Sequence, residues 1–227
     1  MPNYTLNQLI VTCNEGFEKE LLAFIEKAKA PETLISMNNF FPCPQELTDT
    51  KSPCGFLGYY DAMDIINAMT RSRKENNWPH TDDVFNARLI QNIIDGAKGK
   101  ANMKKYGYPT WYEFHCEEWG TKWDIREAEI KEQDACKIVY FFHTAWCHPK
   151  IFFEKVSIWY PNLLFSNQYV NEGEDYIGLF EVKGGQIVTD DYREMNDEER
   201  KKFNVDYEED DEDKEALKTM LEKSPTT

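Results

Sequence analysis

Residues 108–124 read Tyr108-Pro-Thr-Trp-Tyr-Glu-Phe-His-Cys-Glu-Glu-Trp-Gly-Thr-Lys-Trp-Asp124, and this segment indicates an architecture rather than a chemistry. Its spacing predicts a short amphipathic helix, because Tyr112, Cys116, Trp119 and Trp123 recur at intervals of four, three and four residues. A glycine, Gly120, stands where a helix normally ends. Such an apolar helical face must be buried against a large surface, and we expect a β-sheet to supply that surface.

The strongest strand signal lies downstream, in Ile138-Val-Tyr-Phe-Phe-His-Thr-Ala-Trp146. Aromatic and β-branched residues favour extended structure, so this segment predicts a strand over residues 135–145. Strand and helix patterns alternate along the rest of the chain. The other expected elements are a strand over 7–13, a helix over 15–28, an edge strand over 34–44, helices over 59–74 and 81–96, a helix opening at His148-Pro149, a strand over 163–170 and a hairpin of 175–183 with 186–189.

This order of elements predicts an α+β fold, a ferredoxin-like antiparallel sheet covered on one face by helices. We expect a single domain over residues 1–189, in which residues 55–108 form a helical insertion. Residues 190–227 are expected to form an acidic, largely flexible C-terminal tail. The apolar content of 41 % and the aromatic content of 14 % supply ample material for the core of such a domain.

Several functional classes are disfavoured by composition. No apolar run approaches the roughly 20 residues of a membrane span, and the N-terminus lacks the pattern of a signal peptide, so we expect a cytoplasmic protein without a membrane partner. For a phage-encoded protein, this would be the cytoplasm of the host cell. The six cysteines are scattered without paired spacing, which indicates reduced and mostly buried thiols rather than a disulfide framework: Cys13, Cys43, Cys54, Cys116, Cys136 and Cys147.

Charge is strongly negative and unevenly distributed. The net charge of −15 would repel a polyanion, which disfavours general binding to nucleic acid. Residues 190–227 carry 15 acidic and 7 basic residues, whereas residues 59–105 carry 8 basic and 6 acidic residues. Any contact with nucleic acid would therefore have to use the middle segment, although its basic residues are also typical of a solvated helical face.

Thiol and imidazole groups gather in two short motifs, His115-Cys116 and His143-Thr-Ala-Trp-Cys147-His148. These are the usual zinc ligands, and a thiolate beside an imidazole is also the basis of a cysteine hydrolase. However, the spacing matches no common zinc motif, and neighbours on a strand point to opposite sides. We expect no metal site, no cofactor and no catalytic residue, and a cysteine-dependent or metal-dependent hydrolase stays as a second alternative.

Nucleic-acid binding is the first alternative, because a ferredoxin-like sheet can present aromatic rings on which bases stack. Tyr140, Phe142 and Trp146 alternate suitably along the Ile138–Trp146 segment, and the basic residues of the hypothesis are Lys98, Lys100, Lys104 and Lys105. The aromatic residues are equally typical of a buried core, and the flanking helices favour that interpretation.

Separate aromatic, glycine and proline motifs occur in order along the chain: Phe40-Phe-Pro-Cys-Pro44, Trp111-Tyr112, Trp119-Gly-Thr-Lys-Trp-Asp124, Phe142-His-Thr-Ala-Trp146, and Tyr169 with Glu172-Gly-Glu-Asp-Tyr-Ile-Gly178. Together they resemble the YubB-type ferredoxin-like domain family of plasmids and phages. The resemblance covers most of residues 5–188 and implies the ferredoxin-like fold and a mobile-element origin. It transfers no catalytic residue, because the matching positions are structural in kind.

The leading hypothesis is a non-enzymatic protein-interaction module. A run of carboxylates near the C-terminus can imitate a polyanion and occupy the basic groove of a nucleic-acid enzyme. The candidate partner-binding residues are Asp206, Glu208, Glu209, Asp210, Asp211, Glu212 and Asp213. With the mobile-element origin that the resemblance implies, the expected partner is a host protein, such as a defence or nucleic-acid-processing enzyme that the module inhibits. Such a run is also typical of a solubilising tail.

Overall fold

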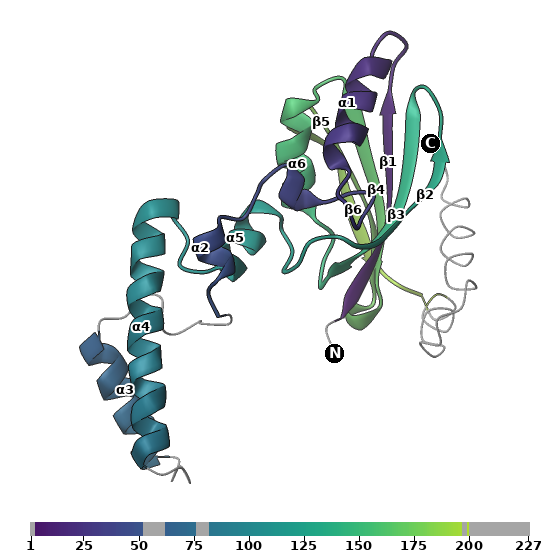
Figure 1. Ribbon diagram of the computed structural model, residues 1–227. Coiled ribbons are helices and arrows are strands. Elements are labelled where there is room, and N and C mark those ends of the chain that lie inside the picture. The colour runs from purple at the N-terminus through teal and green to yellow at the C-terminus, as the bar shows by residue number, and fades with distance from the viewer. Residues whose placement is uncertain (1–2, 52–61, 76–81, 197–198, 200–227) are drawn as a thin grey trace. The chain divides into compact units, whose positions relative to one another are not determined.

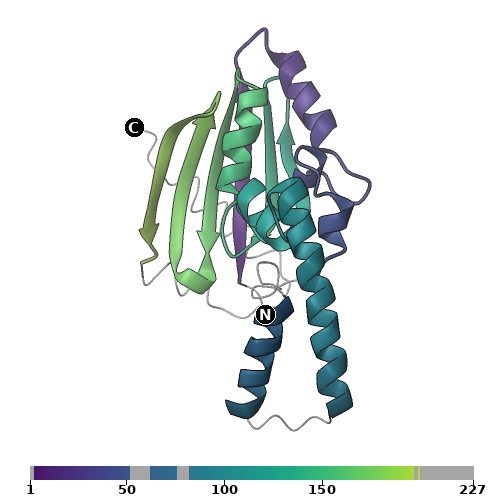
Figure 2. The ribbon, with the colours of Figure 1, turned by 90° about the vertical axis from the view of Figure 1, so that its left-hand side faces the viewer.

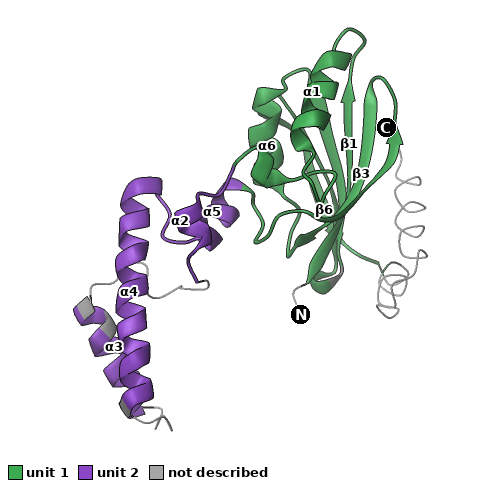
Figure 3. Ribbon diagram, in the orientation of Figure 1, with its two compact units in different colours: residues 1–41, 119–227 green, residues 42–118 purple. Residues whose placement is uncertain are grey.

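The computed structural model describes residues 3–51, 62–75, 82–196 and 199. The chain forms two compact units, coloured separately in Figure 3: residues 1–41 with 119–227, and residues 42–118. The second unit contains the segment 55–108 that the sequence predicts as a helical insertion.

The first unit is built on one six-stranded antiparallel sheet with strand order β2-β3-β1-β4-β5-β6. Helices α1 (Glu18–Ala28) and α6 (Lys150–Trp159) both lie on one face of it (Figures 1 and 2). Strand β3 lies between β1 and β2, so β1, α1 and β2 form a split βαβ unit. The predicted α+β, ferredoxin-like class is therefore confirmed. The strands are β1 (Tyr4–Cys13), β2 (Arg126–Gln133), β3 (Lys137–Ala145), β4 (Leu163–Asn171), β5 (Tyr176–Lys183) and β6 (Gln186–Glu194).

The main core lies between this sheet and the two helices. Burial alternates along β1, with Thr5, Asn7, Leu9 and Val11 fully or almost fully buried. Alternation is the expected pattern for a strand whose successive side chains point to opposite faces. The same face continues across the neighbouring strands and is packed by aromatic side chains from the sheet and helices: Phe24, Tyr140, Phe152, Phe153, Phe165 and Phe180.

The opposite face of the sheet also buries apolar groups. Val139 and Phe141 of β3 form a cluster there with Val170 of β4 and with Met195, which directly follows β6. Leu6, Ile10 and Ile177 are partly buried against this cluster. The sheet therefore carries apolar surface on both faces, unlike a sheet that has one buried and one polar face.

The aromatic corner that opened the sequence has the predicted backbone. Helix α5 spans Trp111–Glu118, and Gly120 adopts φ of +80°, the left-handed conformation that glycine favours after a helix. The Trp119 side chain is buried, and its Nε1 donates a hydrogen bond to the Phe41 carbonyl at 3.0 Å. The predicted shared face is wrong in part, because the buried side chain of α5 is Phe114.

The sheet differs from the prediction in two ways: one predicted strand is absent, and one observed strand was not predicted. The segment 34–44, predicted as an edge strand, instead contains the 3-10 turn Met37–Asn39 and leads into α2 (Gln45–Thr48). Asp124 holds this turn, since its Oδ1 accepts a hydrogen bond from the Met37 amide at 2.7 Å. The second edge strand is β2, which the sequence analysis missed because its residues Arg126–Gln133 are mostly polar and exposed.

The hairpin β5–β6 is confirmed, and β6 continues beyond the predicted end at residue 189 to Glu194. The first residues of the segment predicted as a tail thus belong to the sheet. None of the five described cysteines forms a disulfide bond, and each is half-buried rather than fully buried.

The second unit is helical and contains α2, α3 (Ala62–Glu75), α4 (Asp82–Tyr106) and α5. Met69 of α3 packs with Phe85 of α4. The Asn102 side chain donates hydrogen bonds to the carbonyls of Glu46 and Pro109, which joins α4 to the segments before and after it. Both predicted helices are confirmed, and α4 extends ten residues beyond the predicted end at 96, to Tyr106.

Gly120→Ala should destabilise the protein more than Gly16→Ala. Both glycines have positive φ, which costs a residue with a Cβ about 1–2 kcal/mol. At position 120 the added Cβ would also lie 3.1 Å from the Ile151 backbone nitrogen, whereas nothing lies within 4 Å of the added Cβ at position 16. Denaturant unfolding of both variants measures the difference. Equal losses would mean that the Ile151 segment moves away without cost.

Candidate functional site

Strained backbone gathers at one end of the sheet. The described residues other than glycine with positive φ are Glu127 (52°), Trp146 (72°) and Asp175 (58°). They lie near the start of β2, directly after β3 and directly before β5, and the antiparallel register brings these positions to the same end. Non-glycine residues in this conformation are uncommon and concentrate at functional sites, so this end of the sheet is a candidate site.

Trp146 is held in its strained conformation by backbone hydrogen bonds. Its amide donates to the Asn3 carbonyl at 2.9 Å, and its own carbonyl accepts a hydrogen bond from Asn171 Nδ2. The indole is 37 % exposed. Lys122 Nζ lies 4.7 Å from the ring centroids of both Trp146 and Trp123. The Lys122 ammonium is therefore attracted to both rings, which stabilises the loop that follows β3.

A ladder of buried polar side chains lies beside this loop, on the helix-covered face of the sheet. Asn167 Nδ2 donates to Asn7 Oδ1 at 3.0 Å, and Asn7 Nδ2 donates to Thr144 Oγ1 at 2.9 Å. Thr144 Oγ1 then donates to the Cys147 carbonyl at 2.8 Å. Because buried amides must be paired to be tolerated, this ladder fixes the position of the 146–148 loop against β1 and β4.

His148 lies inside an aromatic stack. Its ring centroid is 3.8 Å from that of Tyr169, with an interplanar angle of 15°, and Phe180 lies on a neighbouring side. Neither ring nitrogen has a hydrogen-bond partner among the described residues. Burial lowers the pKa of His148 to about 4, an effect that Asp190 opposes and Lys150 reinforces. The imidazole is consequently neutral near pH 7.

The thiol beside it makes a different contact. Cys147 Sγ donates to the Gly120 carbonyl at 3.0 Å, whereas the His148 ring makes no hydrogen bond. A cysteine nucleophile needs a base within hydrogen-bond reach. The thiol–imidazole pair that the hydrolase alternative requires is thus not hydrogen-bonded in this arrangement.

The other thiol and imidazole groups of the two motifs lie elsewhere. His143 is on β3, and its Nδ1 is 3.1 Å from Glu127 Oε2. His115 and Cys116 are on α5 in the second unit. Across the described ranges, no group of three or more His, Cys, Asp or Glu side chains is arranged to hold a metal ion.

The residues of the nucleic-acid alternative fall into two environments. Tyr140 is fully buried and Phe142 is 2 % exposed, which favours their interpretation as core residues. The four lysines are exposed on α4. Helical spacing sets Lys98 and Lys105 on one side of α4 and Lys100 and Lys104 on the opposite side. Lys105 Nζ forms an ion pair with Glu46 Oε1 at 2.6 Å, and this ion pair lowers the pKa of Glu46 to about 2. Nucleic-acid binding by these residues remains a prediction.

The acidic candidates Asp206, Glu208, Glu209, Asp210, Asp211, Glu212 and Asp213 lie outside the described residues.

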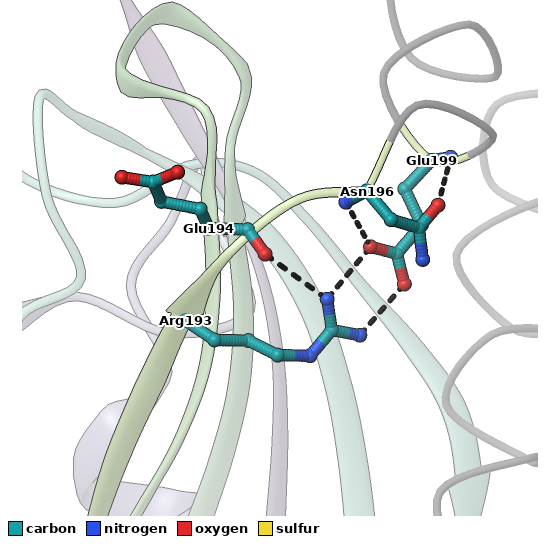
Figure 4. Close-up of polar contacts among 4 residues, drawn as sticks. All are labelled: Arg193, Glu194, Asn196 and Glu199. Atoms are coloured by element: carbon teal, nitrogen blue, oxygen red, sulfur yellow. Dashed lines mark hydrogen bonds and ion pairs between the residues drawn. The ribbon is translucent and has the colours of Figure 1, made fainter.

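Hydrogen bonds link the end of β6 to Glu199, as Figure 4 shows. Arg193 makes two hydrogen bonds of 2.7 Å to the carboxylate of Glu199, which lower the pKa of Glu199. The Asn196 amide donates a hydrogen bond to Glu199 Oε2 at 2.8 Å, and the Glu199 amide donates one to Asn196 Oδ1 at 2.9 Å. This is the geometry of a helix capping box, and the Asn196-Asp-Glu-Glu199 spacing could have indicated it.

The outer edge of the sheet at β6 is a surface that the sequence analysis did not single out. No further described strand pairs with β6 on that side. Three of its side chains are strongly exposed: Ile187 at 49 %, Val188 at 61 % and Tyr192 at 75 %. Ile158 of α6, exposed at 61 %, lies next to the β5–β6 turn, where a Cβ on Gly185 would come within 2.7 Å of it. We call the strand β6 together with Ile158 the β6 edge.

A comparison with protein families agrees with the fold of the sheet unit. Residues 118–219 match the family described as a ferredoxin-like domain in Api92-like protein. Among solved structures, the chain is similar to the protein Api92 from Yersinia pseudotuberculosis, with 10 % sequence identity and a TM-score of 0.41. That similarity covers 86 % of this chain and 99 % of Api92. A search of curated protein sequences found no match. In the described part of the chain, no helix has the length and apolarity needed to cross a membrane.

Lowering the pH from 7 to 4 should destabilise the protein through His148. Because its folded-state pKa of about 4 lies below the ordinary 6.5, the unfolded chain binds the proton first as the pH falls. This stability is present above pH 6.5 and is lost between pH 6.5 and 4, by up to about 3 kcal/mol.

Denaturant unfolding of the parent and of His148→Phe across this range measures the effect. The Phe variant keeps an aromatic ring against Tyr169 but does not titrate, so its stability should fall less on acidification. Identical slopes for the two proteins would show that His148 is not protected from protonation.

Proposed function

We propose that this protein is a non-enzymatic protein-interaction module that binds and inhibits a host defence or nucleic-acid-processing enzyme. The proposal takes the YubB-type assignment and the phage or plasmid origin from the sequence motifs. The proposed location is the cytoplasm of the host cell. The ferredoxin-like domain provides the scaffold, and the acidic residues 206–213 contribute a surface that imitates a nucleic-acid backbone.

The observation that carries the proposal is the β6 edge. Ile158, Ile187, Val188 and Tyr192 are strongly exposed on β6 or beside its hairpin turn, and no further described strand pairs with the outer side of β6. Grouped exposed apolar side chains are typical of protein contact sites, and tyrosine is among the residues enriched at such sites. This favours a protein partner over a small-molecule substrate.

Electrostatics supports the same class of partner. A net charge of −15 attracts a basic surface over a long range and raises the rate of encounter with it. Enzymes that act on nucleic acid have basic grooves for the phosphate backbone. An acidic module can compete for such a groove, whereas it would be repelled by the nucleic acid itself.

Affinity capture with the full-length chain tests this function. We expect a nucleic-acid-processing or defence enzyme to be captured and its activity to be reduced by the purified module in a salt-dependent manner. A full-length variant with the seven acidic residues changed to Asn or Gln, namely Asp206, Glu208, Glu209, Asp210, Asp211, Glu212 and Asp213, should lose at least tenfold in inhibition.

A matched control changes seven exposed acidic residues elsewhere to their amides: Glu15, Glu26, Glu32, Asp64, Glu75, Asp83 and Glu117. Its net charge equals that of the test variant, so a specific acidic surface predicts much weaker inhibition by the test variant only. Equal inhibition by the two variants would show that residues 206–213 act only through the net charge of the protein and form no specific contact. Retention of oligonucleotides without a protein partner would instead support the nucleic-acid alternative.

A further inference from the structure

We propose that the β6 edge binds an extended, basic segment of the partner protein by strand addition. This inference deepens the proposed function, because it names the chemistry of the partner and the mode of contact at the same surface. In strand addition, backbone hydrogen bonds to an open sheet edge provide affinity, and contacts to alternate side chains provide specificity.

The backbone of β6 is suited to this role. The strand spans Gln186–Glu194, and its inner side is paired with β5 over eight positions from Tyr176↔Glu194 to Lys183↔Gln186. The register shifts only once, between Glu181 and Val182, so the run from Thr189 to Glu194 is regular. Backbone N–H and C=O groups on the outer side of an edge strand can pair with an added strand.

The other edge of the sheet, β2, is protected against such pairing. Its register against β3 shifts at two places, and Glu127 has a φ of 52°. Its side chains are mainly charged, and ion pairs join Lys131 to Glu129 and Lys137 to Glu132. Irregular backbone and charged side chains are the usual means by which proteins block an edge. By contrast, β6 shifts register only at Val188, and its regular run from Thr189 to Glu194 carries the exposed Tyr192.

The carboxylates of β6 favour a basic partner strand. Asp190 lies opposite Phe180, on the helix-covered face, and Asp191 lies opposite Leu179, on the other face. Each face of the edge therefore carries one carboxylate at the middle of the strand. Asp190 is paired with Lys150 of α6, and Asp191 lies on the same face of the strand as Arg193. A partner strand with adjacent basic residues at its centre would place one cation on each face, where opposite charges on neighbouring strands stabilise pairing.

The same charges argue against a second copy of this chain. Two β6 strands paired antiparallel about their centres would bring Asp190 and Asp191 of one copy opposite those of the other. Like charges directly opposite each other destabilise a strand pair, and a net charge of −15 on each copy adds repulsion.

The test uses the full-length protein and the probe peptide acetyl-Thr-Val-Thr-Lys-Lys-Val-Thr-Val-Thr-amide. Binding is followed by fluorescence anisotropy and by NMR shifts of the β6 backbone amides. We expect a saturable shift confined to β6 and its hairpin. Replacing both lysines of the peptide by glutamate should weaken binding at least tenfold, and replacing alternate threonines by proline should abolish it, since proline cannot donate the backbone hydrogen bond.

The matched protein variants are Asp191→Lys on β6 and Glu132→Lys on β2, which make the same charge change on opposite edges. Asp191→Lys should weaken peptide binding at least tenfold, whereas Glu132→Lys should leave it within twofold of the parent. Thermal unfolding confirms that both variants are folded. Equal effects of the two variants, or equal binding of the proline peptide, would overturn strand addition at β6. Concentration-dependent self-association that Asp191→Lys strengthens would overturn it in favour of a second copy.

Failure of this inference is distinguishable from failure of the proposed function. If the captured enzyme is inhibited equally by the parent and by Asp191→Lys, the module still functions as proposed, and the β6 edge is not its contact. If the peptide binds as expected but no enzyme is inhibited, strand addition is supported and the inhibitory function is wrong.

Discussion

The register of the central strand β1 is the constraint on which the rest of the sheet depends. It pairs with β3 on one side and β4 on the other, each over nine positions. Shifting a strand by one residue moves every side chain to the opposite face. In the observed register, Leu9 and Val11 enter the main core. Asn7 reaches the amide of Asn167 and the hydroxyl of Thr144. These buried polar groups find their hydrogen-bond partners in this register. The polar ladder and the apolar core therefore favour the same register.

This register also explains where the strain accumulates. It brings the end of β3 and the start of β5 to the same end of the sheet as the start of β1, and the chain must turn sharply there. Trp146 turns with positive φ because its amide and carbonyl are both bonded in that conformation, to Asn3 and Asn171. The strain is thus balanced by hydrogen bonds and by the stack of His148 on Tyr169. At this sheet end the Cys147 thiol and the His148 ring make separate contacts.

Several parts of the fold could be predicted because local sequence and tertiary structure agree. The alternating pattern of residues 7–13, the aromatic run of β3 and the Gly184-Gly185 turn each describe an element whose local preference matches its environment. Prediction failed where they disagree. Residues 34–44 have strand-like apolar content, but Asp124 bonds the Met37 amide and imposes a turn. Strand β2 has almost no strand signal, because an exposed edge needs charges rather than apolar residues.

The sequence by itself determined the α+β class, the helix end at Gly120, the negative charge and the scarcity of motifs for catalysis. These properties depend on local spacing and composition, which can be determined from the sequence without knowledge of the fold. The tertiary structure alone decided that Tyr140 and Phe142 are core residues, that Cys147 and His148 make separate contacts, and that β6 is an edge. The physical reason is that burial, hydrogen-bond partners and strand order depend on residues distant in the chain. Ile158 and Val188, for example, are thirty residues apart in the sequence, yet both contribute to one exposed edge.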